Sequence, residues 1–155
     1  MRITLYKTLF DKTERTPCLV KETATNYGGE TLNNPCAIAR MLRDVFQHDL
    51  ETEEVVYLLC FDTKYKPIGV FQLSKGTVGL SCINPREVYM KALLCGAVTI
   101  VVAHNHPSGD PTPSTSDIDS TQRTLEAGKM LGVKLTDSII IGNNEYYSFQ
   151  EEGRL

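Results

Sequence analysis

Two apolar runs constrain the fold of this 155-residue chain more than any other feature. Residues 55–61 (VVYLLCF) are almost entirely apolar, and residues 97–103 (AVTIVVA) are rich in β-branched side chains. A strand with one face in water alternates apolar and polar residues, so unbroken runs predict strands that are covered on both faces. The chain must therefore place other elements on each side of a central sheet.

Helix signals lie between and beside these strands. Asn34 and Asn84 each precede a proline, which pairs a capping residue with the residue type favoured at the first helical position. The first helix shows one apolar face (Ile38, Met41, Leu42, Val45, Phe46) and is expected to end in the acidic stretch 48–54. The second is expected to reach about Leu94, with Glu87 completing a capping box. A third is predicted from Ser114 to about Leu131, where Gly132 stops it.

The remaining segments complete a layered arrangement. Further strands are predicted at 67–74, 134–141 and 146–149, with a short one near 78–82. Residues 1–33 are interpreted as an N-terminal extension with short strands around 3–9 and 18–23, and residues 34–155 as the domain proper. The order of elements predicts an α/β fold, a layered mixed β-sheet flanked by helices.

Bulk composition excludes several classes of protein. The net charge of −3 argues against a domain that coats nucleic acid, because phosphate binding needs clustered Lys and Arg. No stretch reaches the 18 or so apolar residues of a membrane helix, and the start lacks the pattern of a secretion signal. Five widely spaced cysteines then indicate reduced thiols in a cytoplasmic protein, with Cys60 and Cys95 as small core residues.

One cluster of residues predicts chemistry. His104 and His106 are two of only three histidines, and their spacing at a strand end places both rings on one face. Converging neutral imidazoles are natural zinc ligands. Asp117, in the first turn of the next helix, should point back toward them as a third ligand, which leaves one position for water. The alternative is that Ser114 and Asp117 form only a capping box and that the histidines are exposed loop residues.

The spacing H-x-H-x7-S-x-x-D resembles the JAMM motif of the JAB/MPN superfamily, whose fold is of the cytidine deaminase-like type. The string HNHPSGDPTPS, with NPREV before it and SIIIG after it, resembles the RadC branch in particular, over about residues 35–155. The resemblance implies Zn²⁺ on His104, His106 and Asp117, and a hydrogen-bonding Ser114. It also implies a glutamate that acts as the general base and lies just before an early strand. Glu54 fits this position, and Glu53 and Glu51 are the alternatives.

Two features depart from the RadC pattern. Many RadC sequences have histidines where this chain has Asn84 and Ser138, and their replacement is expected to alter activity. Long RadC proteins also have an N-terminal helix-hairpin-helix region thought to contact DNA. This chain leaves no room for it and resembles the short RadC-like proteins of bacterial mobile elements. DNA-associated partners remain open, but no direct DNA-binding region is evident.

The resemblance predicts a zinc-dependent metallopeptidase or amide hydrolase acting on a peptide or protein substrate. Zinc would activate a water molecule, Glu54 would take its proton, and Ser114 would donate a hydrogen bond to the oxyanion. The alternative is a non-catalytic metal-binding module associated with a protein or DNA partner. A zinc deaminase would need H-x-E followed by P-C-x-x-C, and neither pattern occurs.

Overall fold

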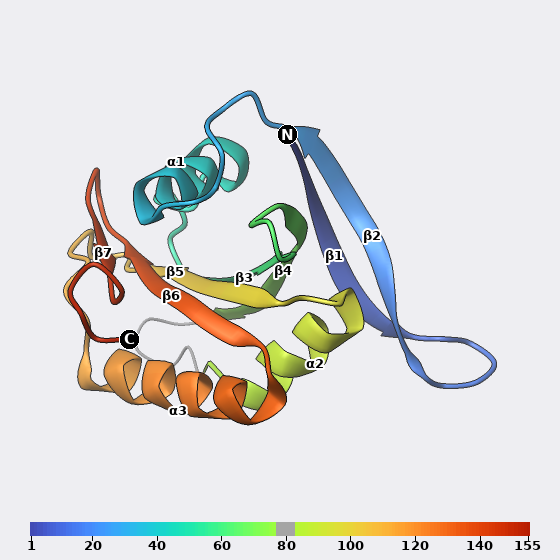
Figure 1. Cartoon of the computed structure of the whole chain (residues 1–155). Coiled ribbons are helices and arrows are strands. Elements are labelled where there is room, and N and C mark those ends of the chain that lie inside the picture. Colours follow the sequence, from blue (N-terminus) through green and yellow to red (C-terminus); the bar gives the residue numbers. More distant parts are fainter. Residues whose placement is uncertain (77–82) are drawn as a thin grey trace.

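The computed structural model describes residues 1–76 and 83–155 and contains a seven-stranded mixed sheet with the order β2-β1-β4-β3-β5-β6-β7 (Figure 1). The strands are β1 (Arg2–Phe10), β2 (Pro17–Asn26), β3 (Glu54–Phe61), β4 (Pro67–Gly76), β5 (Thr99–Asn105), β6 (Lys134–Ile141) and β7 (Tyr146–Ser148). The β1–β4 and β5–β6 pairs are parallel, and the other neighbours are antiparallel. The predicted short strand near 78–82 lies outside the described residues.

The two apolar runs form β3 and β5, which are adjacent in the middle of the sheet and buried at every position. Helix α1 (Pro35–Phe46) covers one face of the sheet, and α2 (Pro85–Cys95) and α3 (Thr115–Leu131) cover the other (Figure 1). The predicted layered α/β fold is therefore confirmed. Both faces of β3 and β5 are covered, which explains why their sequences do not alternate.

Alternate residues of β3 enter two separate hydrophobic cores. Val55, Tyr57 and Leu59 pack with α1, whereas Val56, Leu58 and Cys60 pack with α2 and the inner side of α3. Successive side chains of a strand point to opposite faces. Even-numbered residues at the start of β3 therefore lie on the face of the sheet that α2 and α3 cover.

The helix boundaries follow the capping signals with two differences. Asn34 accepts a hydrogen bond from the Ala37 backbone N–H at 2.8 Å, as an N-cap should. Helix α1 ends at Phe46, short of the acidic stretch, because Gln47 adopts a left-handed conformation with φ of 51°. Glu87 does not close a capping box; its carboxylate contacts Arg86 and Lys91 instead.

The N-terminal strands are longer than predicted. β1 and β2 form an antiparallel hairpin that projects from the body of the molecule at its turn end (Figure 1). β1 also pairs in parallel with β4 through Leu5–Val70 and Tyr6–Phe71, and Ile3 lies in the core beneath α1. The first 26 residues therefore supply two strands of the main sheet.

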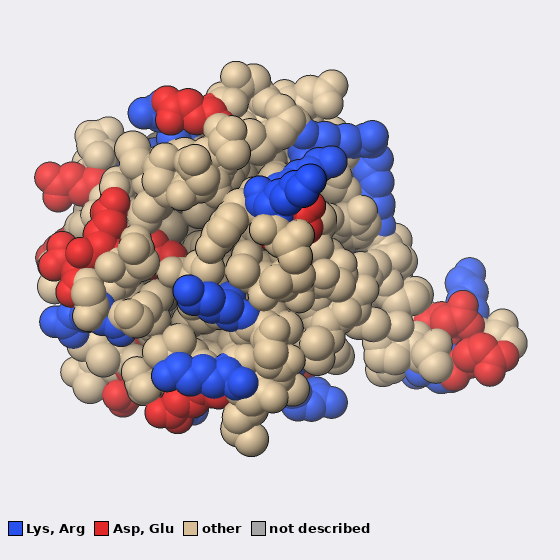
Figure 2. Space-filling view, in the orientation of Figure 1, with Lys and Arg blue, Asp and Glu red and all other residues tan. Residues whose placement is uncertain are grey.

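Charged side chains are mixed over the surface in view. On the face shown in Figure 2, Lys and Arg lie in several small groups among neutral and acidic residues. This distribution agrees with the small net negative charge. Among the helices of the described residues, none has both the length and the apolar composition that crossing a membrane requires.

Candidate metal centre

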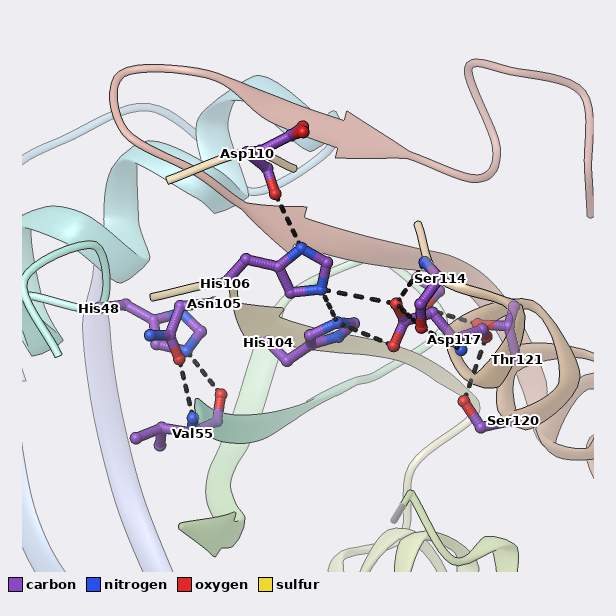
Figure 3. A network of polar contacts seen from close by, with 11 residues as sticks. His48, Val55, His104, Asn105, His106, Asp110, Ser114, Asp117, Ser120 and Thr121 are labelled. Atoms are coloured by element: carbon purple, nitrogen blue, oxygen red, sulfur yellow. Dashed lines mark hydrogen bonds and ion pairs between the residues drawn. The ribbon is translucent and has the colours of Figure 1, made fainter. Parts of the chain in front are cut away.

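His104, His106 and Asp117 converge at the end of β5 (Figure 3). The His104 Nε2 atom lies 3.2 Å from His106 Nε2 and 3.2 Å from Asp117 Oδ1, and His106 Nε2 lies 3.5 Å from Asp117 Oδ2. Tetrahedral ligands that each lie 2.0–2.1 Å from zinc are about 3.3 Å apart. The spacing therefore fits a common metal ion, and the three side chains meet as the sequence predicted.

Two rigid elements deliver these side chains. β5 is paired on one side with β3 and on the other with β6, so the strand that holds His104 cannot shift independently. The chain then turns: the His106 backbone N–H donates to Ile141 O at 3.0 Å, and Gly109 N–H donates to His106 O at 2.9 Å. Gly109 has φ of 82°, a conformation that favours glycine. This turn leads into α3, whose first turn holds Asp117.

A hydrogen bond fixes the state of one imidazole. His106 Nδ1 lies 2.8 Å from the backbone carbonyl of Asp110, which can only accept. The Nδ1 proton therefore donates to Asp110, and Nε2 is left to face His104 and Asp117. Nε2 donates to the carboxylate when it is protonated and offers a lone pair to a metal ion when it is not. Metal-binding histidines commonly use the second ring nitrogen in this way. His104 is fully buried, and its Nδ1 has no hydrogen-bond partner among the described residues.

The electrostatics favour a charged carboxylate at the centre. Burial alone would raise the pKa of Asp117, but hydrogen bonds to His104, His106 and Ser114 bring that pKa well below its usual range. The hydrogen bond to Asp117 raises the pKa of His106 against the opposing effect of desolvation, and the negative charge of Glu54 adds to the rise. An ionised carboxylate with two imidazoles is a donor set that suits zinc and leaves a coordination position open.

Ser114 and Asp117 also form a complete capping box. Asp117 Oδ2 accepts from the Ser114 backbone N–H at 2.7 Å and from Ser114 Oγ at 2.6 Å, while Asp117 N–H faces Ser114 Oγ at 3.2 Å. The cap and the convergence with the histidines therefore coexist. Ser114 fixes the rotamer of Asp117, and the same carboxylate meets both imidazoles.

Glu54 lies beside this centre. It is the first residue of β3 and is only 6% exposed. Val56 pairs with His104 at the end of the antiparallel β3–β5 ladder, and Glu54 lies two residues earlier on the same face of β3. Its charge acts on His106 from there. The rivals point elsewhere, because Glu51 and Glu53 form ion pairs with Lys75 at 2.8 and 3.5 Å.

Residues 32–154 match the family model of the RadC-like JAB domain. The chain belongs to this family. A UPF0758 protein of Clostridium perfringens is 40% identical over 121 residues, which cover 78% of this chain and 52% of the relative. For a UPF0758 protein of Thermotoga maritima the identity is 47% over 102 residues, or 66% and 46% of the two chains. For one of Pelobacter propionicus it is 39% over 136 residues, or 85% and 59%. This RadC-like chain thus spans about half the length of the curated relatives it matches.

The two departures from the RadC pattern have local structural roles. The Asn84 side chain caps α2 by accepting from the Arg86 backbone N–H at 3.0 Å. Ser138 is buried, and its hydroxyl accepts a hydrogen bond from Thr121 Oγ1 at 3.0 Å, which links β6 to α3. Both replacements are thus accommodated within the RadC-like fold.

Two buried polar residues near the centre were not predicted from the sequence. His48 is fully buried and its Nε2–H donates to the Val55 carbonyl at 2.8 Å. Asn105, between the two metal-site histidines, is 1% exposed and contacts the backbone at the start of β3. The available signal was Asn105 itself, a polar residue within a buried apolar strand, where an unsatisfied amide would be costly.

His48 should make the stability of this RadC-like domain depend on pH. Burial lowers the pKa of His48 from its ordinary value of 6.5 to about 4. Above pH 6.5 His48 is neutral in both the folded and the unfolded chain. As the pH falls from 6.5 toward 4, the unfolded chain binds a proton at His48 more readily than the folded chain does, so the free energy of unfolding falls. We expect the free energy of unfolding to fall by about 3 kcal/mol over this range from His48 alone. Urea unfolding of chelator-treated protein at several pH values measures it; an equally steep fall in His48→Gln would contradict the assignment.

Proposed function

We propose that this chain is a zinc-dependent hydrolase of amide bonds, acting on a peptide or isopeptide bond of a protein or peptide substrate. The observation that supports the proposal most directly is the close spacing of three donor side chains, which suits a tetrahedral zinc ion, with a buried glutamate at the neighbouring strand start. Two imidazoles and one carboxylate leave a position open, as hydrolytic zinc sites require.

Each residue has a distinct task in this proposal. His104, His106 and Asp117 would hold the zinc ion. When bound, zinc polarises the scissile carbonyl and lowers the pKa of water toward about 7. Glu54 accepts the proton that the attacking water loses and delivers it to the leaving nitrogen. The turn carbonyl of Asp110 keeps the His106 imidazole in the tautomer that presents Nε2.

Ser114 has a positioning task and a second one that needs movement. Its hydroxyl donates to Asp117 Oδ2 at 2.6 Å, so it orients the proposed ligand. To donate to an oxyanion instead, the hydroxyl would rotate away from Asp117. The Ser114 backbone N–H, which also donates to Oδ2, would keep the carboxylate in place during that rotation.

A non-catalytic metal-binding module is the second candidate. Its support is the presence of Asn84 and Ser138 at positions where many RadC sequences have histidine. Such a module would use the same three metal-site residues and bind a protein or a DNA-associated partner without hydrolysis. The hydrolase and the non-catalytic module would share the metal centre and differ only in whether a bound substrate is hydrolysed.

Metal removal and reloading test the proposal. The chain is stripped with a chelator, reloaded with zinc, and assayed against a fluorogenic peptide library and a library of ε-linked lysine isopeptides. We expect about one zinc per chain by mass spectrometry and hydrolysis that chelation abolishes and zinc restores. Stoichiometric zinc without cleavage in either library would favour the non-catalytic module.

A further inference from the structure

The side chain of Asn105 points away from the metal centre. Its neighbours His104 and His106 direct their rings toward Asp117, whereas the Asn105 carboxamide turns to the other side of β5, toward Val55 (Figure 3). Alternating side-chain directions along a strand explain this split. The residue between the two histidines therefore makes its contacts with the start of β3.

Three hydrogen bonds satisfy this carboxamide. Its Oδ1 accepts from the Val55 backbone N–H at 2.7 Å, and its Nδ2 donates to the backbone carbonyls of Glu53 at 3.0 Å and Glu51 at 3.3 Å. A carboxamide offers an acceptor and two donors at one site, which no carboxylate or hydroxyl does. The side chain is thus matched to both kinds of backbone group that it meets.

Two of these bonds bracket Glu54. The Glu53 carbonyl belongs to the peptide group that precedes the Glu54 Cα atom, and the Val55 N–H belongs to the one that follows it. Both peptide groups are fixed by one side chain from β5. The regular β3–β5 pairing runs only as far as Val56 and His104, so Asn105 continues the connection between the strands beyond that point.

We propose that Asn105 is a positioning residue that sets the location of Glu54 relative to the two histidines. The inference rests on the proposed function, in which Glu54 is the general base. One rigid strand then supplies two metal ligands and, through the intervening side chain, the anchor for the base. A displacement of about 1 Å in a catalytic group can cost on the order of 100-fold in rate.

Asn105→Asp is the sharpest test, because aspartate keeps the size of asparagine and an acceptor for Val55 N–H. It lacks the donor, and its second oxygen would face the carbonyls of Glu53 and Glu51. We expect kcat of the zinc-loaded protein to fall roughly 10- to 100-fold, with KM and zinc content maintained. Amide hydrogen exchange at Val55 should accelerate.

Two further variants distinguish positioning from a general loss of stability. Tyr89→Phe removes a buried 2.7 Å hydrogen bond from α2 to the Thr124 carbonyl of α3 and should retain the wild-type kcat. In the double variant Glu54→Gln with Asn105→Asp, kcat should be no lower than in Glu54→Gln alone, because Asn105 acts through Glu54. A purely structural role would lower kcat further. If Asn105→Asp does not fold, Asn105→Ser replaces it as the smaller neutral variant.

The outcomes separate this inference from the proposed function. Absence of cleavage by the zinc-loaded wild type would overturn the function, and equal cleavage by wild type and Glu54→Gln would overturn the role of Glu54 as the base. In both cases Val55 exchange would still decide whether Asn105 anchors the start of β3. Loss of activity in Glu54→Gln with wild-type kcat in Asn105→Asp would overturn the positioning role alone. Loss of bound zinc in Asn105→Asp would also overturn it, since the residue would then support the ligands and not the base.

Discussion

Glu54→Gln should lower kcat of the zinc-loaded protein by roughly 10²- to 10⁴-fold, the range that a general base typically contributes. Glutamine fills the same buried position at the start of β3 but cannot accept and return a proton. The three proposed zinc ligands are untouched, so metal content should stay at the wild-type level. Steady-state hydrolysis of the best library substrate, with metal analysis of the same sample, measures both quantities.

Glu53→Gln is the matched control for this variant. Glu53 is adjacent in sequence, carries the same charge, and forms an ion pair with Lys75 at 3.5 Å. Exposed ion pairs contribute about 0–1 kcal/mol, so its loss should leave both folding and kcat nearly unchanged. If Glu53→Gln lost activity and Glu54→Gln kept it, the identity of the base would be wrong while the metal centre remained.

The convergence of two imidazoles and one carboxylate could be predicted because its information is local in sequence. His104, His106 and Asp117 lie within 14 residues of one another, so a strand end and a helix start are enough to bring them together. The capping interaction of Ser114 with Asp117 is equally local and was visible as S-x-x-D. The two interpretations of Asp117, as part of a helix cap and as a candidate metal ligand, are geometrically compatible.

The anchoring of Glu54 could not be predicted because it depends on distant partners. Asn105 bonds to Val55 across 50 positions of sequence, and both acceptors of its Nδ2 protons are backbone carbonyls. Almost every residue has the same backbone groups, so the sequence does not indicate which of them a buried side chain will contact. His48 was missed for the same reason, since its partner is the Val55 carbonyl.

The N-terminal strands were underestimated for a different physical reason. β2 is an edge strand, and β1 pairs with β4 at only two positions, so most of their side chains are partly or fully exposed. Without a continuous buried face, the sequence shows no clear period of two. Helix α1, by contrast, has a strong apolar stripe, and its start at Pro35 was predicted correctly.

Zinc should raise the thermal stability of this chain substantially, and Asp117 should be required for the effect. A ligand that binds only the folded state stabilises it by about 4 kcal/mol at 1,000 times its Kd. For a domain of this size that corresponds to roughly 8–16 °C in Tm. Calorimetry of chelated and zinc-loaded protein measures the shift. In Asp117→Asn the shift should largely disappear, because a neutral amide is a poor zinc ligand.

Asp117→Asn should leave the metal-free fold nearly intact. Its amide oxygen can still accept from the Ser114 backbone N–H, so the helix cap survives. Asp119→Asn, two residues along α3 and exposed, removes the same charge without touching the centre and should keep the full zinc-dependent shift. A full shift in Asp117→Asn would mean that zinc binds elsewhere on the chain. The spacing of the two imidazoles and the carboxylate would then have no metal to explain it, and the hydrolase proposal would lose its foundation.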